Sequence, residues 1–143
     1  MRVILFRGQT RRKGEKVWLD GSPVDSNWVY GGIFPNNNGG DFALIYQQEP
    51  EIHKFPVYAD TVGQYTGLND KNGNKIFEGD IVRLTFSEEV VGKIICDINY
   101  YFEVYLFGKT THKSLSDYLP YDLEILGNIH DNPELLEVQN EQG

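Results

Sequence analysis

The chain has 143 residues and a mass of 16.4 kDa, which suits one ordinary domain or two small units. Its 13 Lys and Arg oppose 21 Asp and Glu, which gives a net charge of −8, and no apolar run is long enough to cross a membrane. The single cysteine, Cys96, excludes an internal disulfide framework and a cysteine-based zinc site. The apolar segment Val3–Phe6 is too short for a secretory signal peptide. We therefore expect a soluble protein that is not anchored in a membrane.

Residues 1–59 form the first predicted region, which is rich in β-strands. Short β-branched and aromatic runs alternate there with Gly, Asn and Pro breaks, a pattern typical of strands and turns. The predicted strands are Val3–Phe6, Lys16–Leu19, Asn27–Phe34, Asp41–Gln47 and Ile52–Tyr58. Gly8–Gly14 is predicted as a polar turn, and the pair Gly31-Gly32 indicates a bulge or a close approach of two backbones.

Residues 60–143 form the second predicted region. Gly79 allows a sharp entry into one strand and Gly92 allows strong bending of the next, an arrangement typical of small SH3-like barrels. The residues Asp131, Asn132 and Pro133 predict one short C-terminal helix over residues 131–137, and Leu115–Leu119 is predicted as a single helical turn. The predicted strands are Val62–Tyr65, Lys75–Phe77, Ile81–Phe86, Val90–Ile98, Tyr100–Phe107 and Asp122–Ile129.

The charges are unevenly distributed. Residues 1–50 hold six basic and five acidic residues, whereas residues 51–143 hold seven basic and sixteen acidic ones. An acidic domain repels phosphate backbones, so general nucleic-acid binding is disfavoured. One basic cluster is the exception and is the candidate anion- or nucleic-acid-binding loop, although a solvated hairpin tip is the favoured explanation of such a charge run. It comprises Arg7, Arg11, Arg12, Lys13 and Lys16.

Few residues have the spacing that catalysis or metal binding needs. His53, His112 and His130 lie far apart and none has a second ligand at metal spacing, so we expect no metal and no cofactor. Glu78 and Asp80 are close enough to form a carboxylate pair, but acidic turns show the same spacing. We therefore expect a protein that is not an enzyme.

Asp70 begins a pattern, at residues 70–74, that resembles the start of a calcium-binding loop. The match fails because Lys75 occupies the position that requires glycine and Ile81 the position that requires a bidentate glutamate. Asp70 is better explained as a side chain that closes the tight turn at Asn72-Gly73.

The chain is rich in aromatic residues, which favours either a platform for stacked bases or a core and protein-interface role. The negative net charge, and the absence of Arg and Lys around Tyr100–Phe107, favour the core and interface role. The aromatic residues concerned are Trp18, Trp28, Tyr30, Phe34, Tyr100, Tyr101, Phe102 and Tyr105.

A long central motif, VGQYTGLNDKNGNKIFEGDIV at residues 62–82, carries a family resemblance. Together with FRG at 6–8, WVYG at 28–31 and EILGNIHDNPELL at 124–136, it resembles the YopX-like proteins of bacteriophages and prophages. The segment Gln9–Ser26, which contains most of the basic cluster, is longer than in the family pattern. The resemblance implies an SH3-like barrel in the second half, a β-rich N-terminal part and a location in the cytoplasm of a bacterial host. It supplies no catalytic residue and no cofactor.

These observations favour a non-enzymatic accessory protein that binds a host or phage protein. The candidate partner-binding residues lie in the central motif and are Gln64, Tyr65, Asp70, Glu78 and Asp80. A nucleic-acid-binding protein that uses the basic cluster is the alternative, and an enzyme that uses Glu78 or Asp80 is the third hypothesis. Self-association into a homo-oligomer is also expected, because small β-proteins must cover their strand edges.

Overall fold

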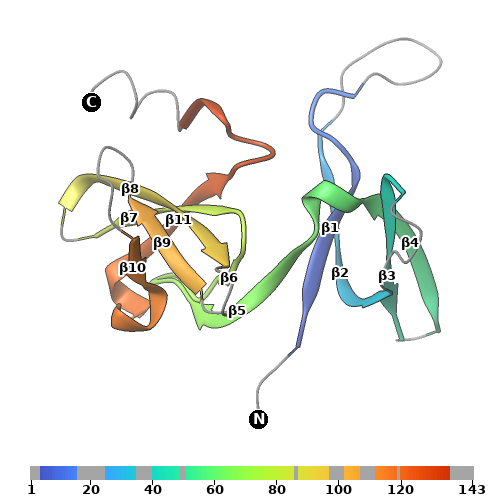
Figure 1. The fold of residues 1–143 in the computed structure, drawn as a ribbon, viewed down its shortest axis with the longest axis horizontal. Helices are drawn as coiled ribbons and strands as arrows, with labels where there is room; N and C mark the ends of the chain where they lie inside the picture. Colours follow the sequence, from blue (N-terminus) through green and yellow to red (C-terminus); the bar gives the residue numbers. More distant parts are fainter. Residues whose placement is uncertain are drawn as a thin grey trace. The chain divides into compact units, whose positions relative to one another are not determined.

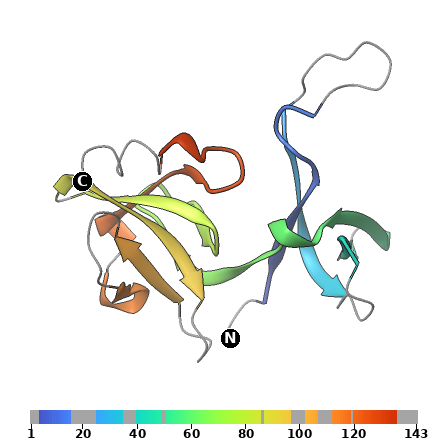
Figure 2. The same ribbon diagram turned by 45° about the horizontal axis from the view of Figure 1, so that its top comes forward.

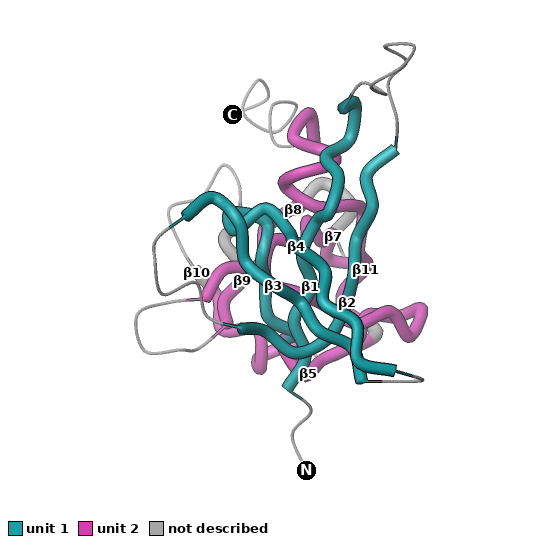
Figure 3. Tube along the Cα trace, turned by 90° about the vertical axis from the view of Figure 1, so that its right-hand side faces the viewer, with its two compact units in different colours: residues 1–65 teal, residues 66–143 magenta. Residues whose placement is uncertain are grey.

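The structure, a computed structural model, describes residues 4–15, 25–34, 40–48, 51–85, 87–96, 102–106, 112–118 and 120–135. The chain divides into two compact units, residues 1–65 and residues 66–143 (Figure 3). The described strands form two antiparallel sheets (Figure 1), which confirms the mainly β prediction. Within the described part of the chain, no helix has the length and apolar character needed to cross a membrane.

The first unit is built on the strand order β4-β3-β2-β1-β5. These strands are β1 (Phe6–Arg11), β2 (Asn27–Phe34), β3 (Phe42–Gln47), β4 (His53–Tyr58) and the start of β5 (Gly63–Asn69). A 3₁₀ turn, η1 (Ala59–Thr61), follows β4, and β5 continues into the second unit, where β6 (Lys75–Phe77) is its neighbour in the sheet. The strands predicted at Asn27–Phe34, Asp41–Gln47 and Ile52–Tyr58 are confirmed to within a residue.

The core of the first unit lies on one face of this sheet. Val29, Ala43, Ile45 and Val57 are buried there together. Along β3, Ala43 and Ile45 point into the core, so the residues between and beside them must point away from it.

The prediction of a polar turn at Gly8–Gly14 is wrong for its first residues, because Gly8 to Arg11 belong to β1. Gln9 of this segment is polar but only 1% exposed. Its backbone N–H donates to Thr61 Oγ1 at 2.8 Å, so this strand contacts a residue far along the chain. Gly8 faces Val57 so closely that a Cβ would overlap it. The predicted strand Lys16–Leu19 lies outside the described residues.

The second unit contains a five-stranded sheet in the order β10-β9-β8-β7-β11 (Figure 2). Its strands are β7 (Asp80–Leu84), β8 (Ser87–Cys96), β9 (Phe102–Leu106), β10 (His112–Ser114) and β11 (Leu123–Asn128). Val82 and Leu84 are buried in its core, and Ile81 is fully buried as well. The other buried members of this core are Ile76, Ile94, Phe102, Leu115 and Leu123.

The closed SH3-like barrel predicted for this unit is not confirmed. The pairings leave the sheet open, because β10 pairs with β9, β11 pairs with β7, and these two strands form opposite edges. Two 3₁₀ turns, η2 (Leu115–Asp117) and η3 (Pro120–Asp122), connect the edges. The short C-terminal helix is also not confirmed: only Glu134 and Leu135 of its predicted span are helical, and residues 136 and 137 lie outside the described part.

Candidate functional site

The outer face of the first unit's sheet carries apolar and aromatic side chains instead of the polar ones that usually face water. Strand pairing places Phe34, Leu44 and Pro56 in one row across β2, β3 and β4. Phe42 pairs with Tyr58 on one side of this row, and Tyr46 pairs with Lys54 on the other. We call this surface the aromatic face; its members are Phe34, Phe42, Leu44, Tyr46, Pro56 and Tyr58.

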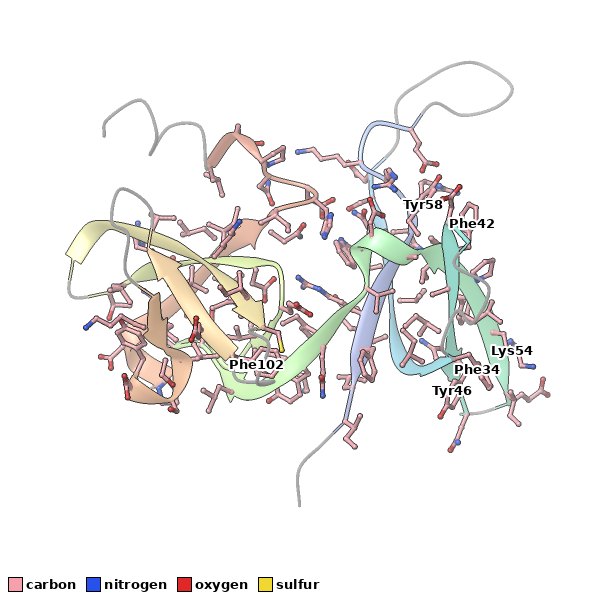
Figure 4. All side chains as sticks on the ribbon, viewed as in Figure 1. Phe34, Phe42, Tyr46, Lys54, Tyr58 and Phe102 are labelled. Atoms are coloured by element: carbon pink, nitrogen blue, oxygen red, sulfur yellow. The ribbon has the colours of Figure 1, made fainter. Side chains whose placement is uncertain are left out.

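The rings of the aromatic face form two pairs, at opposite ends of β3 and β4 (Figure 4). Phe42 and Tyr58 have ring centroids 5.2 Å apart, and Phe34 and Tyr46 have centroids 4.8 Å apart, with tilted planes in both pairs. The Lys54 ammonium lies 5.3 Å from the centroid of the Phe34 ring, within the range of a cation–π contact. Packing of this kind fixes the rings while it leaves them at the surface.

The exposure of this face is unusual for side chains of such size. Phe42 is 55% exposed, Phe34 42% and Leu44 37%. Single exposed apolar residues are common on protein surfaces, whereas contiguous ones mark sites where another molecule binds. The adjacency of these three residues through the β2–β3–β4 ladder therefore makes the aromatic face the leading candidate site.

A turn at residues 12–15 lies against one end of this face. The Arg12 guanidinium lies 4.0 Å from the centroid of the Tyr58 ring and donates to Asp60 Oδ1 at 2.9 Å. The Tyr58 hydroxyl donates to Glu15 Oε1 at 2.6 Å, and the Arg12 backbone N–H donates to the same oxygen at 2.9 Å. The bond from Tyr58, followed by the one from Arg12, lowers the pKa of Glu15, and the same bond raises the pKa of the Tyr58 phenol.

A cavity of about 390 Å³ opens where this turn meets the aromatic face. Phe42 and Tyr58 are its aromatic lining residues, and Arg12, Asp41 and Asp60 are its charged ones. Gly40 and Ala59 complete the lining.

The basic cluster is not displayed as a single exposed patch. Arg7 is only 7% exposed and its guanidinium lies 4.6 Å from the centroid of the Trp28 ring, while Arg12 is held as described above. Arg11 and Lys13 are exposed, and Lys16 lies outside the described residues. Two of the four described cations are thus engaged by aromatic rings of their own sheet.

Asp70, from the central motif, performs a structural task. It is 2% exposed, and its Oδ1 accepts the backbone N–H groups of Asn72 and Asn74, each at 2.9 Å. Its Oδ2 accepts the N–H of Ile125 in β11 at 3.0 Å. The predicted role of Asp70 in closing the Asn72-Gly73 turn is confirmed, and Gly73 has the expected positive φ of 82°.

The remaining motif candidates are also built into the fold. Asp80 is 2% exposed and its Oδ2 accepts the Phe77 N–H at 2.7 Å, while Glu78 is half-buried. Tyr65 is 7% exposed and Gln64 is half-buried in β5. Three of the five partner-binding candidates, Tyr65, Asp70 and Asp80, are therefore buried in the structure.

An ion triad lies on the sheet of the second unit. Glu124 Oε2 accepts Lys71 Nζ at 2.6 Å and the Arg83 guanidinium at 3.0 Å, and Arg83 is its cross-strand partner. Lys71 first, and Arg83 second, hold the pKa of Glu124 below its usual value. Among the residues that the structure describes, no group of three or more His, Cys, Asp or Glu is placed to hold a metal ion.

The fold and this surface define a mainly β protein of two units with an exposed aromatic sheet face. The family model described as YopX protein matches residues 24–137, so the chain belongs to the YopX family. No curated protein matches the chain. It is similar to a solved structure, the crystal structure of protein EF1440 from Enterococcus faecalis, with 21% identity, a TM-score of 0.48 and coverage of 95% of this chain and 99% of that chain.

Proposed function

We propose that this YopX-family protein is a non-enzymatic interaction module that binds a protein partner through the aromatic face. The observation that supports the proposal is the contiguity of Phe34, Leu44 and Phe42 on three paired strands, each more than a third exposed. Aromatic residues are enriched in the centres of protein interfaces, because they contribute a large apolar area at a small cost in conformational entropy. The partner is a protein of the bacterial host or of the phage.

The geometry of the first unit favours docking onto the face over strand addition at its edge. β4 is the edge strand, and it contains Pro56, which lacks an N–H, and Lys54, whose charge opposes edge pairing. The second unit, for which we propose an SH3-like architecture, contributes the family motif as a structural element through Asp70 and Asp80.

Site-specific photo-crosslinking in the bacterial host tests this proposal. A Leu44→benzoylphenylalanine variant should form a discrete adduct with one protein, whereas the same group at Lys75, which is exposed in the second unit, should not. The adduct partner is then purified, and its affinity is measured for the wild type and for a Phe42→Ala variant. Loss of a buried aromatic contact at an interface costs about 2 kcal/mol, so we expect binding to weaken about 30-fold.

Two outcomes would overturn the proposal. Equal affinity of the wild type and the Phe42→Ala and Leu44→Ala variants would show that the face is not the binding surface. An adduct with nucleic acid would show that the aromatic face binds single-stranded nucleic acid instead of a protein. In such binding, bases stack on aromatic rings beside cations such as Lys54.

A further inference from the structure

The cavity at the Phe42–Tyr58 end of the aromatic face has a charge that its own residues do not balance. Arg12 is neutralised by Asp60 at 2.9 Å. Asp41 has no such compensation, because its carboxylate makes no hydrogen bond or ion pair with any residue that the structure describes. The lining therefore combines one spare negative charge with two aromatic rings.

One cation of the protein already binds to an aromatic ring and a carboxylate that line this cavity. The Arg12 guanidinium is placed against the Tyr58 ring with a carboxylate, Asp60, as its hydrogen-bond acceptor. Phe42 is the neighbouring ring, is 55% exposed, and directly follows Asp41 in sequence. Asp41 and Phe42 both line the cavity, so a second cation there would meet a carboxylate and an aromatic ring, the two types of group that hold Arg12.

An anion fits the cavity poorly. It would compete with Asp60 for Arg12, and it would meet the uncompensated Asp41 carboxylate. An uncharged apolar side chain would fill the space but would leave Asp41 without a partner.

We infer that this cavity receives a lysine or arginine side chain of the protein partner, flanked in the partner by apolar residues that cover Leu44 and Phe34. The inference rests on the proposed function and names the chemistry of the partner.

A displayed library of random twelve-residue peptides, selected on the immobilised full-length protein, tests the inference. Peptides that lose binding to a Leu44→Ser variant are those that use the aromatic face. We expect these peptides to combine apolar residues with Lys or Arg more often than the unselected library does. One such peptide is then synthesised with arginine and with citrulline, which has nearly the same shape but no charge.

The affinities of these two peptides separate charge from shape. Exposed ion pairs and cation–π contacts are modest, so Asp41→Asn should weaken the arginine peptide about five- to tenfold, and the citrulline peptide hardly at all. Glu51→Gln is the matched control, because Glu51 is also exposed but lies at the other end of β3 and β4. It should leave both affinities unchanged. Circular dichroism confirms that the variants are folded.

The possible failures are distinguishable. Face-dependent peptides that lack Lys and Arg, or an arginine peptide that Asp41→Asn does not weaken, would overturn the inference and leave the proposed function intact. A library in which no peptide depends on Leu44 would count against both.

Discussion

At the scale of single residues, buried carboxylates of the family motif act as fixed acceptors for backbone N–H groups. Asp70 accepts three of them and so joins the turn after β5 to β11. An acidic residue in a motif turn attracts a catalytic interpretation. The Asp70 carboxylate, however, accepts three backbone N–H groups and Asp70 is 2% exposed, which gives it a sufficient structural role.

The Asp70→Asn substitution tests this structural role. It replaces one acceptor oxygen by an NH₂ group that faces a backbone N–H, and a buried donor without an acceptor costs about 1–3 kcal/mol, more next to a lost charge. We expect the free energy of unfolding to fall by about 3 kcal/mol in urea denaturation followed by circular dichroism. The matched variant Asp117→Asn changes an exposed side chain in η2 and should stay within about 0.5 kcal/mol of the wild type. Equal stability of both variants would contradict the role of Asp70.

The ion triad of Glu124, Lys71 and Arg83 makes the free energy of unfolding depend on pH. Because Lys71 and Arg83 lower the pKa of Glu124 in the folded state, folding favours its charged form. That contribution is complete above the unfolded pKa of about 4.5 and is lost as the pH falls through the lower folded value. We expect Glu124→Gln to flatten the decline of unfolding free energy below pH 5, measured by urea titrations from pH 6 to pH 3. If the unfolding free energy of the variant declined below pH 5 as steeply as that of the wild type, the Glu124 ion pairs would not cause the decline.

At the scale of elements, the paired glycines of β2 allow it to approach β3. A Cβ at Gly31 would overlap the backbone carbonyl oxygen of Tyr46, and one at Gly32 would overlap the Tyr46 ring. The predicted close backbone approach at Gly31-Gly32 is thus confirmed, and it sets the register that aligns Phe34 with Leu44.

The Gly31→Ala variant should disrupt the first unit selectively. The methyl group meets backbone, which cannot rotate away, so β2 and β3 must separate locally. Both tryptophans, Trp18 and Trp28, lie in residues 1–65, so tryptophan fluorescence reports this unit alone. We expect the variant's denaturation midpoint, followed by tryptophan fluorescence, to fall below that of the wild type. Hydrogen exchange of the Ile81 and Ile94 amides in the second unit should be unchanged. If the midpoint equalled that of the wild type, the overlap of the added methyl group with the Tyr46 carbonyl oxygen would be relieved without a loss of stability.

Particular elements show how far sequence alone leads. Short apolar and aromatic runs between Gly, Asn or Pro breaks or charged residues identified β2, β3, β4 and β6, because local composition decides these strands. β1 was misplaced as a turn, since its polar residues are buried by partners such as Thr61 and Trp28 that lie far along the chain. Barrel closure was not predictable either, because it depends on which edges pair.

The aromatic face had a signal that sequence reasoning did not use. In Phe42-Ala43-Leu44-Ile45-Tyr46 both alternating sets are apolar, although only one can face the core of a single sheet. Such a strand is either covered on both sides or exposed on one, and only the structure distinguishes these cases.

At the scale of the whole molecule, the two units differ in charge. Residues 1–65 hold seven basic and seven acidic residues, whereas residues 66–143 hold six and fourteen, so the net charge of −8 belongs to the second unit. The neutral unit carries the aromatic face, where apolar contacts dominate, and the acidic unit carries the family motif.

This charge distribution predicts weak affinity for nucleic acids. With Arg7 and Arg12 held by aromatic rings and the second unit acidic, fluorescence anisotropy with single-stranded DNA and RNA at 50 mM salt should show no saturable binding. Binding that Arg11→Ala abolishes would instead support the basic cluster as an anion site.

The most direct measurement of the central claim is the backbone amide spectrum of the isotope-labelled protein, recorded by NMR as its crosslinked partner or a selected peptide is added. The account predicts that shifts concentrate on β2, β3 and β4, around Phe34, Phe42 and Leu44, with the amides of Asp70 to Asp80 unmoved. Shifts confined to the motif, or to the exposed Arg11 and Lys13, would contradict it.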